Sequence, residues 1–231
     1  MLSVANIDSY YARSQILHRA TADIPTGEIT AVLGRNGVGK TTFLKTIMGL
    51  TDRMSGQITL DGKPLGTEPT FRRARAGIAY VPQGREIVPD FTVRENILMG
   101  AFAAPPGERE VPPLVGELFP YLRDNMNRHG GLLSGGQQQQ LAIARALAAK
   151  PSILLLDEPT EGIQPNIVEE IENIIIRLNK ELGLTIILVE QNLEFARRAG
   201  DNFVMMEKGR IVASGRMSDL TDDLIHRHLA V

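Results

Sequence analysis

The chain of 231 residues has no cysteine and no tryptophan, and only 5% of its residues are aromatic. The absence of cysteine excludes disulfides, thiolate nucleophiles and cysteine-ligated zinc. No run approaches the ~18 apolar residues that a membrane-spanning helix needs, so we expect any membrane role to act through a partner. The net charge of −2 lacks the basic excess typical of nucleic-acid binders, and we expect no nucleic-acid partner.

Apolar residues, by contrast, make up 43% of the chain, enough for the core of one sizeable domain. Several short apolar runs are continuous rather than alternating, which is typical of parallel strands buried on both faces. These expected strands cover residues 29–33, 78–81, 153–156 and 185–189. A helical pattern at residues 166–180, preceded by Pro165, separates the last two, and this order predicts an α/β fold.

Two other regions have different patterns. Residues from about 2 to 33 and from about 56 to 61 predict short strands joined by turns, and hence a small antiparallel sheet beside the parallel one. Residues from about 86 to 150 are mostly helical in pattern, with an exposed loop expected at the Pro- and Gly-rich residues 104–113. We therefore expect a helical subdomain inserted into the α/β core.

Residues 34–41 match the pattern G-x-x-x-x-G-K-[ST] in full, between an expected strand and a helical segment at residues 42–48. The backbone N–H groups of such a loop and of the helix start bind phosphate oxygens. Lys40 would neutralise the β- and γ-phosphates of a nucleotide, and the hydroxyl of Thr41 would bind Mg²⁺. A chance match in a glycine-rich turn is the alternative. The residues expected at the phosphates are Gly34, Arg35, Asn36, Gly37, Val38, Gly39, Lys40, Thr41 and Thr42.

Two acids, Asp157 and Glu158, end the expected strand at residues 153–156. Ligands bind at the strand ends of open parallel sheets. Asp157 is expected to hold Mg²⁺ through water, and Glu158 to polarise the attacking water as a general base. A strand followed by a solvated acidic turn is the alternative, and the phosphate-binding loop makes it the weaker interpretation.

Five residues, Leu133, Ser134, Gly135, Gly136 and Gln137, precede a helical pattern that runs to about residue 149. Together with the two motifs above, this LSGGQ sequence resembles the nucleotide-binding domain of ABC transporters, over essentially the whole chain. The resemblance implies that Ser134 and the glycine amides form a second anion site at a helix N-terminus, facing the γ-phosphate bound by the opposite subunit. An ordinary helix cap at Ser134 is the alternative.

Two further positions gain a role from the resemblance. Gln83 is similar to the family glutamine that touches Mg²⁺ and the attacking water, and the alternative is a polar turn residue after Pro82. Tyr11 resembles the aromatic residue that stacks on adenine, with the adjacent Tyr10 as the alternative.

Two positions depart from the family pattern. Gln191 stands where the family usually has a histidine, and none of the four histidines lies there. Gln164 stands where an aspartate is usual. A glutamine can hydrogen-bond a γ-phosphate or a water but carries no positive charge, so these changes bear on turnover more than on binding. Taken together, the acidic pair and the resemblance give Glu158, Gln191 and Gln83 as the expected catalytic residues.

These departures narrow the resemblance to a subgroup. The sequence of residues 190–192, EQN, resembles the branched-chain amino acid importers, and residues 133–146 and 157–165 resemble most closely the urea importer ATP-binding subunit. An ATPase that energises uptake of a small polar solute, most specifically urea, is thus implied, with branched-chain amino acids as the alternative. A soluble ABC ATPase of DNA repair or translation is a rival from another class. A binding-only module is a third interpretation, against which the intact Glu158 argues.

The resemblance implies a P-loop NTPase fold in a single ABC ATPase domain, residues 1–231. The ATP-binding core would comprise residues 1–85 and 151–231, and the helical subdomain residues 86–150. ATP and Mg²⁺ are the implied cofactors. The implied partners are a second ATPase subunit, two integral membrane permeases and, indirectly, a solute-binding protein. We expect the second ATPase to be a different chain, with a homodimer as the alternative, and we expect the complex at the cytoplasmic face of the inner membrane, with residues 85–96 contacting a permease.

Overall fold

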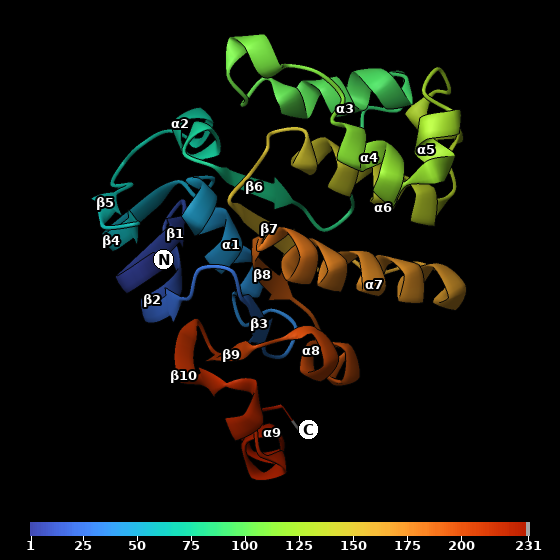
Figure 1. The fold of residues 1–231 in the computed structure, drawn as a ribbon. Coiled ribbons are helices and arrows are strands. Elements are labelled where there is room, and N and C mark those ends of the chain that lie inside the picture. The colour runs from blue at the N-terminus through green and yellow to red at the C-terminus, as the bar shows by residue number, and fades with distance from the viewer. Residues whose placement is uncertain (230–231) are drawn as a thin grey trace.

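A computed structural model describes residues 1–229 of the chain, which form two sheets and the helices around them (Figure 1). The smaller sheet has the order β2-β1-β4-β5, and its paired strands are antiparallel. Its strands are β1 (Leu2–Tyr11), β2 (Ser14–Ile24), β4 (Arg53–Leu60) and β5 (Lys63–Pro64). The antiparallel sheet is thus confirmed, but the expectation of short strands is wrong for β1 and β2, which pair with each other over almost their whole length.

The larger sheet has the order β10-β9-β3-β8-β7-β6. Four of its strands were predicted: β3 (Ile29–Leu33), β6 (Ile78–Val81), β7 (Ile153–Asp157) and β8 (Thr185–Val189). They are parallel, as expected, and β7 runs one residue further to include Asp157. Two strands were not predicted: β9 (Asn202–Glu207) continues the parallel set beside β3, and β10 (Arg210–Arg216) is antiparallel to β9. The α/β class is confirmed.

Successive residues of β7 point to opposite faces of the larger sheet, as the pleat of a strand requires. Ile153 and Leu155 pack in a core that includes Phe43 of α1 (Lys40–Met48) and apolar residues of the antiparallel sheet. Leu154 and Leu156 pack in the core on the other face, with α6 (Gly135–Leu147) and α7 (Pro165–Leu182). Burial on both faces explains why the strands read as continuous apolar runs.

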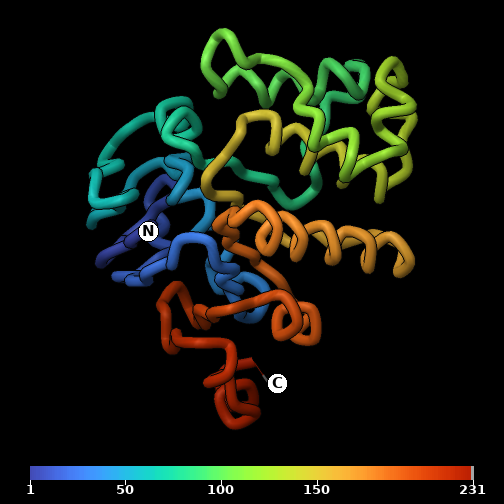
Figure 2. Tube along the Cα trace, viewed as in Figure 1, coloured from blue at the N-terminus to red at the C-terminus, as the bar shows by residue number. Residues whose placement is uncertain are grey.

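The middle of the chain is helical and gathers on one side of the molecule, away from the antiparallel sheet (Figure 2). The segment contains α3 (Val93–Ala101), η1 (Pro106–Glu108), α4 (Pro113–Leu118), α5 (Pro120–Asp124), η2 (Gly130–Leu132) and α6. Helix α3 crosses α6 so closely that a Cβ atom on Gly100 would lie 1.8 Å from the carbonyl oxygen of Arg145. The predicted loop at residues 104–113 contains only the short η1 before α4 begins.

The remaining helices are α2 (Thr70–Arg75), α8 (Leu193–Ala199), η3 (Met217–Asp219) and α9 (Asp222–His228). Within residues 1–229, no helix combines the length and the apolar character that crossing a membrane requires.

Candidate nucleotide-binding site

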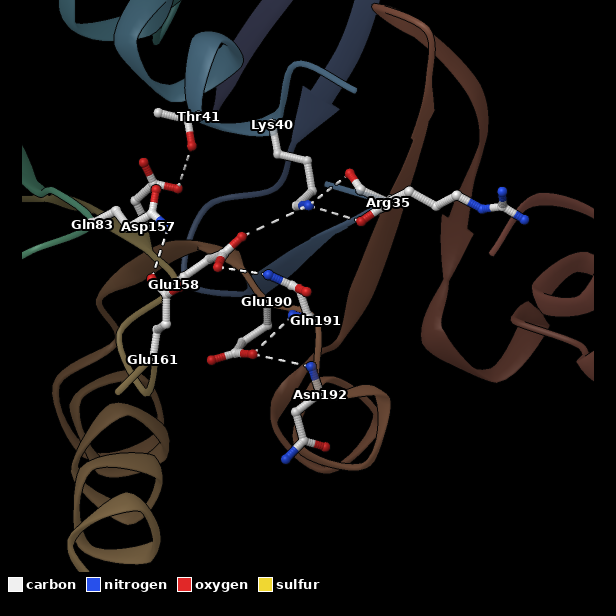
Figure 3. A network of polar contacts seen from close by, with 11 residues as sticks. Arg35, Lys40, Thr41, Gln83, Asp157, Glu158, Glu161, Glu190, Gln191 and Asn192 are labelled. Carbon is white, nitrogen blue, oxygen red and sulfur yellow. Dashed lines mark hydrogen bonds and ion pairs between the residues drawn. The ribbon is translucent and has the colours of Figure 1, made fainter. Parts of the chain in front are cut away.

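The order of the larger sheet explains how distant residues come together. Parallel strands present their carboxyl ends at one edge, where ligands bind in open α/β sheets. Along this edge, the loop after β3 carries the phosphate-binding motif, and Glu190 and Gln191 follow β8. Strand β7 ends in Asp157 and is followed by Glu158, and Gln83 follows β6. Figure 3 shows the side chains converging from these loops.

Lys40 lies almost fully buried at the start of α1. Its ammonium group donates to the carbonyl oxygens of Gly34, at 2.8 Å, and Arg35, at 3.1 Å, and lies 3.8 Å from Oε1 of Glu158 (Figure 3). Burial lowers the pKa of Lys40, while the carboxylates of Glu158 and Asp157 oppose that shift. The neighbouring carboxylates offset only part of the cost of burying this cation, and a bound phosphate would supply further negative charge.

Gly39 caps the N-terminus of α1 in the left-handed region, with φ of +108°. A side chain at this φ is strained, and a Cβ atom would lie 3.1 Å from Leu17. The glycine therefore lets the loop turn tightly into the helix. The free N–H groups at the start of this helix are then available to bind phosphate oxygens.

Asp157 is buried and accepts two hydroxyl hydrogen bonds, each of 3.0 Å, from Thr41 and Tyr80. Burial raises the pKa of Asp157, although both hydrogen bonds act in the opposite direction. Paired hydroxyl and carboxylate oxygens suit Mg²⁺, which prefers hard oxygen ligands. A divalent cation here would also offset the cost of burying the carboxylate, so Thr41 and Asp157 fit the ion.

Glu158 leaves β7 in the left-handed region, with φ of 48°, and its backbone N–H donates to the carbonyl of Val189 at 3.0 Å. This uncommon conformation turns the carboxylate into the cavity, where it accepts a 2.7 Å hydrogen bond from Nε2 of Gln191. Burial raises the pKa of Glu158, against the effects of Gln191 and Lys40. The carboxylate is thus oriented and poorly solvated, as a general base requires.

Lys40, Thr41, Glu158 and Gln191 line one cavity of about 480 Å³, and Asp157 lies buried behind Thr41. Its lining includes Lys40, Thr41, Thr42, Asn36, Gly37, Gly39, Glu158, Gln83, Gln191, Tyr11 and also Glu161 and Ile16. Of the two adjacent tyrosines, Tyr11 faces this cavity. The ring of Tyr10 instead lies under the guanidinium of Arg53, with 4.2 Å between the guanidinium carbon and the ring centre. Gln83 donates to Glu161 at 2.7 Å.

The LSGGQ residues lie apart from this cavity. Ser134 caps α6: its hydroxyl accepts from the backbone N–H of Gln137, whose side chain in turn accepts from the N–H of Ser134. Ser134, Gly135 and Gly136 line a separate cavity of about 200 Å³ together with residues 162–164. Within one chain, the structure therefore does not bring the two sets of expected phosphate contacts together.

Three residues at the site were missed by the sequence reasoning. Tyr80 contacts Asp157, and Glu161 contacts Gln83. The third is Glu190, which is 4% exposed. The sequence pattern could have identified Glu190, because it directly follows an apolar run, residues 186–189. Asp157 and Glu158 follow the apolar run at residues 153–156 in the same way. No such signal marked Tyr80, whose contact depends on the pairing of β6 with β7.

A family model described as "ABC transporter" matches residues 17–161. The chain belongs to the ABC transporter family. This ABC protein is 42% identical over 213 residues to the high-affinity branched-chain amino acid transport ATP-binding protein BraG of Pseudomonas aeruginosa, covering 92% of this chain and 91% of BraG. It is 39% identical over 225 residues to the probable branched-chain amino acid transport ATP-binding protein LivF of Archaeoglobus fulgidus, covering 96% and 94% of the two chains.

Solved structures agree with the family. A dimeric ATP-binding cassette in a post-hydrolysis state, bound to ADP and Pi, matches with a TM-score of 0.80 and 26% identity, over 94% of this chain and 99% of that one. The ABC protein described here is accordingly an ATPase of the ABC type, with the P-loop NTPase fold that the motifs predicted.

Proposed function

We propose that this ABC ATPase energises the import of branched-chain amino acids. The observation that carries the proposal is the similarity to BraG and LivF, which extends over more than nine tenths of each chain and not only over the motifs. The likeness to the urea importer subunit, in contrast, rests on the residues around the shared catalytic motifs. The comparisons therefore favour the alternative expectation over urea.

In the proposed reaction, the loop at residues 34–41 holds the phosphates of ATP and Tyr11 stacks on the adenine. Thr41 and Asp157, with Gln83 at the next strand end, would hold Mg²⁺, which would neutralise phosphate charge. Glu158 accepts a proton from the attacking water as the water oxygen bonds to the γ-phosphorus. The bond from that phosphorus to the bridging oxygen breaks, which leaves ADP and inorganic phosphate. Gln191 donates to Oε2 of Glu158, so the water would approach Oε1, which lies 3.8 Å from the ammonium of Lys40.

The second half of each ATP site would come from another chain. The separation of the Ser134 cavity from the Lys40 cavity supports this arrangement, because one chain cannot offer both to one nucleotide. We propose a dimer with a different ATPase subunit, which closes on two ATP molecules and opens after hydrolysis. The dimeric state of the structural relative is consistent with this cycle.

The remaining parts of the proposal concern assembly at the membrane. Residues 1–85 and 151–231 would act as the ATP-binding core, and residues 86–150 as the helical subdomain. Residues 85–96 would contact one of two permease subunits at the cytoplasmic face of the inner membrane. A solute-binding protein would deliver the cargo from the other side.

The mechanism is tested with Glu158→Gln. We expect turnover of ATP to fall by about 10²–10⁴-fold, because the general base is lost. We also expect this variant to accumulate as a dimer in ATP and Mg²⁺, with itself or with the partner ATPase subunit once that is added, since closure no longer ends in hydrolysis. Size-exclusion chromatography measures the dimer, and Lys40→Ala, which removes the phosphate contact, is the control that stays monomeric. Wild-type turnover in Glu158→Gln would remove Glu158 from its proposed role.

The cargo is tested by uptake in cells that encode the chain. Deletion of its gene should abolish accumulation of radiolabelled leucine, isoleucine and valine, and leave urea uptake unchanged. The wild-type gene should restore uptake, and the Glu158→Gln gene should not. Loss of urea uptake with normal amino acid uptake would reverse the assignment in favour of urea.

A further inference from the structure

Glu190 is a buried acid that belongs to none of the roles above. It follows β8, between the strand and Gln191, and is 4% exposed. Its Oε2 accepts the backbone N–H groups of Gln191, at 2.9 Å, and Asn192, at 3.1 Å. Its Oε1 accepts the hydroxyl of Thr160. Figure 3 shows the carboxylate beneath the loop that presents Gln191.

These bonds join the two loops that surround Glu158. Thr160 lies two residues after Glu158, and Gln191 donates to Glu158 at 2.7 Å, so Glu158, Thr160, Glu190 and Gln191 form a closed ring of covalent and hydrogen-bonded links. On the far side, Asn192 caps α8 by accepting the N–H groups of Glu194 and Phe195. The backbone at Gln191 is therefore held on both sides, while its side chain is exposed to the cavity.

We propose that Glu190 is a positioning residue for ATP hydrolysis: it holds the Gln191 loop against the loop after Glu158, so that the Gln191 amide stays on the general base. The proposal rests on the role proposed for Glu158. The Glu190 carboxylate accepts from three protein donors and is not among the residues that line the nucleotide cavity, so its role is assigned through Gln191 and not through direct contact with the nucleotide.

Substitutions at Glu190 and Thr160 distinguish the loss of these hydrogen bonds from the loss of the negative charge of Glu190. Glu190→Gln keeps one acceptor oxygen for the two backbone N–H groups, and its amide can donate to the Thr160 hydroxyl, which is able to accept. Glu190→Ala leaves all three donors without their acceptor. Thr160→Val removes only the bond between the loops, and Thr160→Ser restores it.

The test is a double-mutant cycle with Gln191→Ala, measured as single-turnover hydrolysis of radiolabelled ATP by whichever wild-type form hydrolyses, the purified chain or its complex. In the wild-type background we expect Glu190→Ala to lower the rate by about 10–100-fold, as small misplacements near a reacting group do, with the Kd for ATP little changed. In the Gln191→Ala background the same change should cost less than about 2-fold, because the group it positions is gone.

Three further variants keep the proposal falsifiable if Glu190→Ala unfolds. Thr160→Val should follow the same pattern, with a smaller loss, while Glu190→Gln and Thr160→Ser should stay close to wild type. Equal losses in both backgrounds, or losses that follow a fall in Tm, would mean that Glu190 acts only on the fold and would overturn the proposal. Glu158→Gln runs alongside: if that variant turns over normally, the role of Glu158 has failed, and the failure is distinguishable from that of Glu190.

Discussion

Around the nucleotide cavity, three largely buried carboxylates lie close to the buried ammonium of Lys40. Asp157, Glu158 and Glu190 all raise the pKa of Lys40 through their charge, in opposition to the larger effect of burial. Burial also raises the pKa values of Asp157 and Glu158. Burial of the charged forms of Asp157 and Glu158 therefore costs folding free energy, and such perturbed groups are typical of functional sites.

We predict that Glu158→Gln stabilises the nucleotide-free chain at neutral pH. A raised pKa means that the folded state binds a proton at Glu158 more readily than the unfolded chain, so the ionised form opposes folding above that pKa. Glutamine removes the charge and keeps an oxygen for Gln191. Thermal unfolding should give a higher Tm for the variant at pH 7.5. The difference should narrow as the pH falls from the raised pKa of Glu158 toward about 4, and it should vanish below that pH, where glutamate is protonated even in the unfolded chain.

The matched control is Glu110→Gln, because Glu110 is exposed. Its Tm should follow that of the wild type at every pH. A gain in Glu158→Gln that does not change with pH would point to packing and not to charge.

Among individual residues, the sequence identified those that belong to motifs, but not the residues that contact the motif residues and hold them in place. Lys40 and Thr41 end the phosphate-binding motif, whereas Asp157 and Glu158 stand at the end of an apolar strand, and all four could be assigned from pattern alone. Tyr80 and Glu161 could not, because each reaches its partner, Asp157 or Gln83, through a side chain whose direction depends on the assembled sheet.

Among the elements, the crossing of α3 and α6 is the closest contact between helices described above. Gly100 lies against the carbonyl oxygen of Arg145, and Arg145 in turn donates to the carbonyl oxygens of Glu86 and Arg85. The crossing therefore joins α6, which begins with the LSGGQ residues, to the segment that follows β6 and Gln83.

We predict that Gly100→Ala lowers the free energy of unfolding by about 1–3 kcal/mol, the usual cost of overpacking. The added Cβ would meet backbone at 1.8 Å, so no side chain can move aside to accommodate it. Gly107→Ala is the control, since nothing lies within 4 Å of a Cβ at that position. Urea denaturation measures both, and equal stabilities would contradict the tight crossing.

The elements found from sequence were those with continuous apolar runs. Strands β3, β6 and β8 match their expected bounds, whereas β9 and β10 went unpredicted. In β9 the buried run contains Met205 and Met206, which are not β-branched and favour no strand strongly. Strand β10 lies at the sheet edge with Arg210, Ser214 and Gly215, and pairing with β9 determines its conformation more than its own residues do.

For the whole molecule, the two separated cavities support our proposal that each ATP site is shared between chains. In a dimer of this chain with itself, Lys40→Ala disables one half of each site and Ser134→Arg the other half, so each variant alone has no intact site. Mixing them creates one dimer in which the unaltered halves of the two chains meet.

We therefore predict that the mixture regains ATPase activity that neither variant has alone, up to about half that of the wild type per mixed dimer. The measurement is steady-state hydrolysis across mixing ratios, which should peak near equal amounts. Each variant mixed with itself at the same total concentration is the control. Under conditions in which the wild-type chain alone hydrolyses ATP, a mixture as inactive as its components would mean that each site lies within one chain.

The hydrogen bond from Tyr80 to Asp157 has a spectroscopic consequence. The chain has four tyrosines and no tryptophan, so no indole dominates its ultraviolet emission. Tyrosine emission is sensitive to contact with carboxylates and to ring stacking, and Tyr80 reports on the cation site while Tyr11 faces the nucleotide cavity. Mg²⁺ alone should alter the emission of Tyr80, and a nucleotide that of Tyr11, so the summed tyrosine emission of the unlabelled protein responds to both ligands.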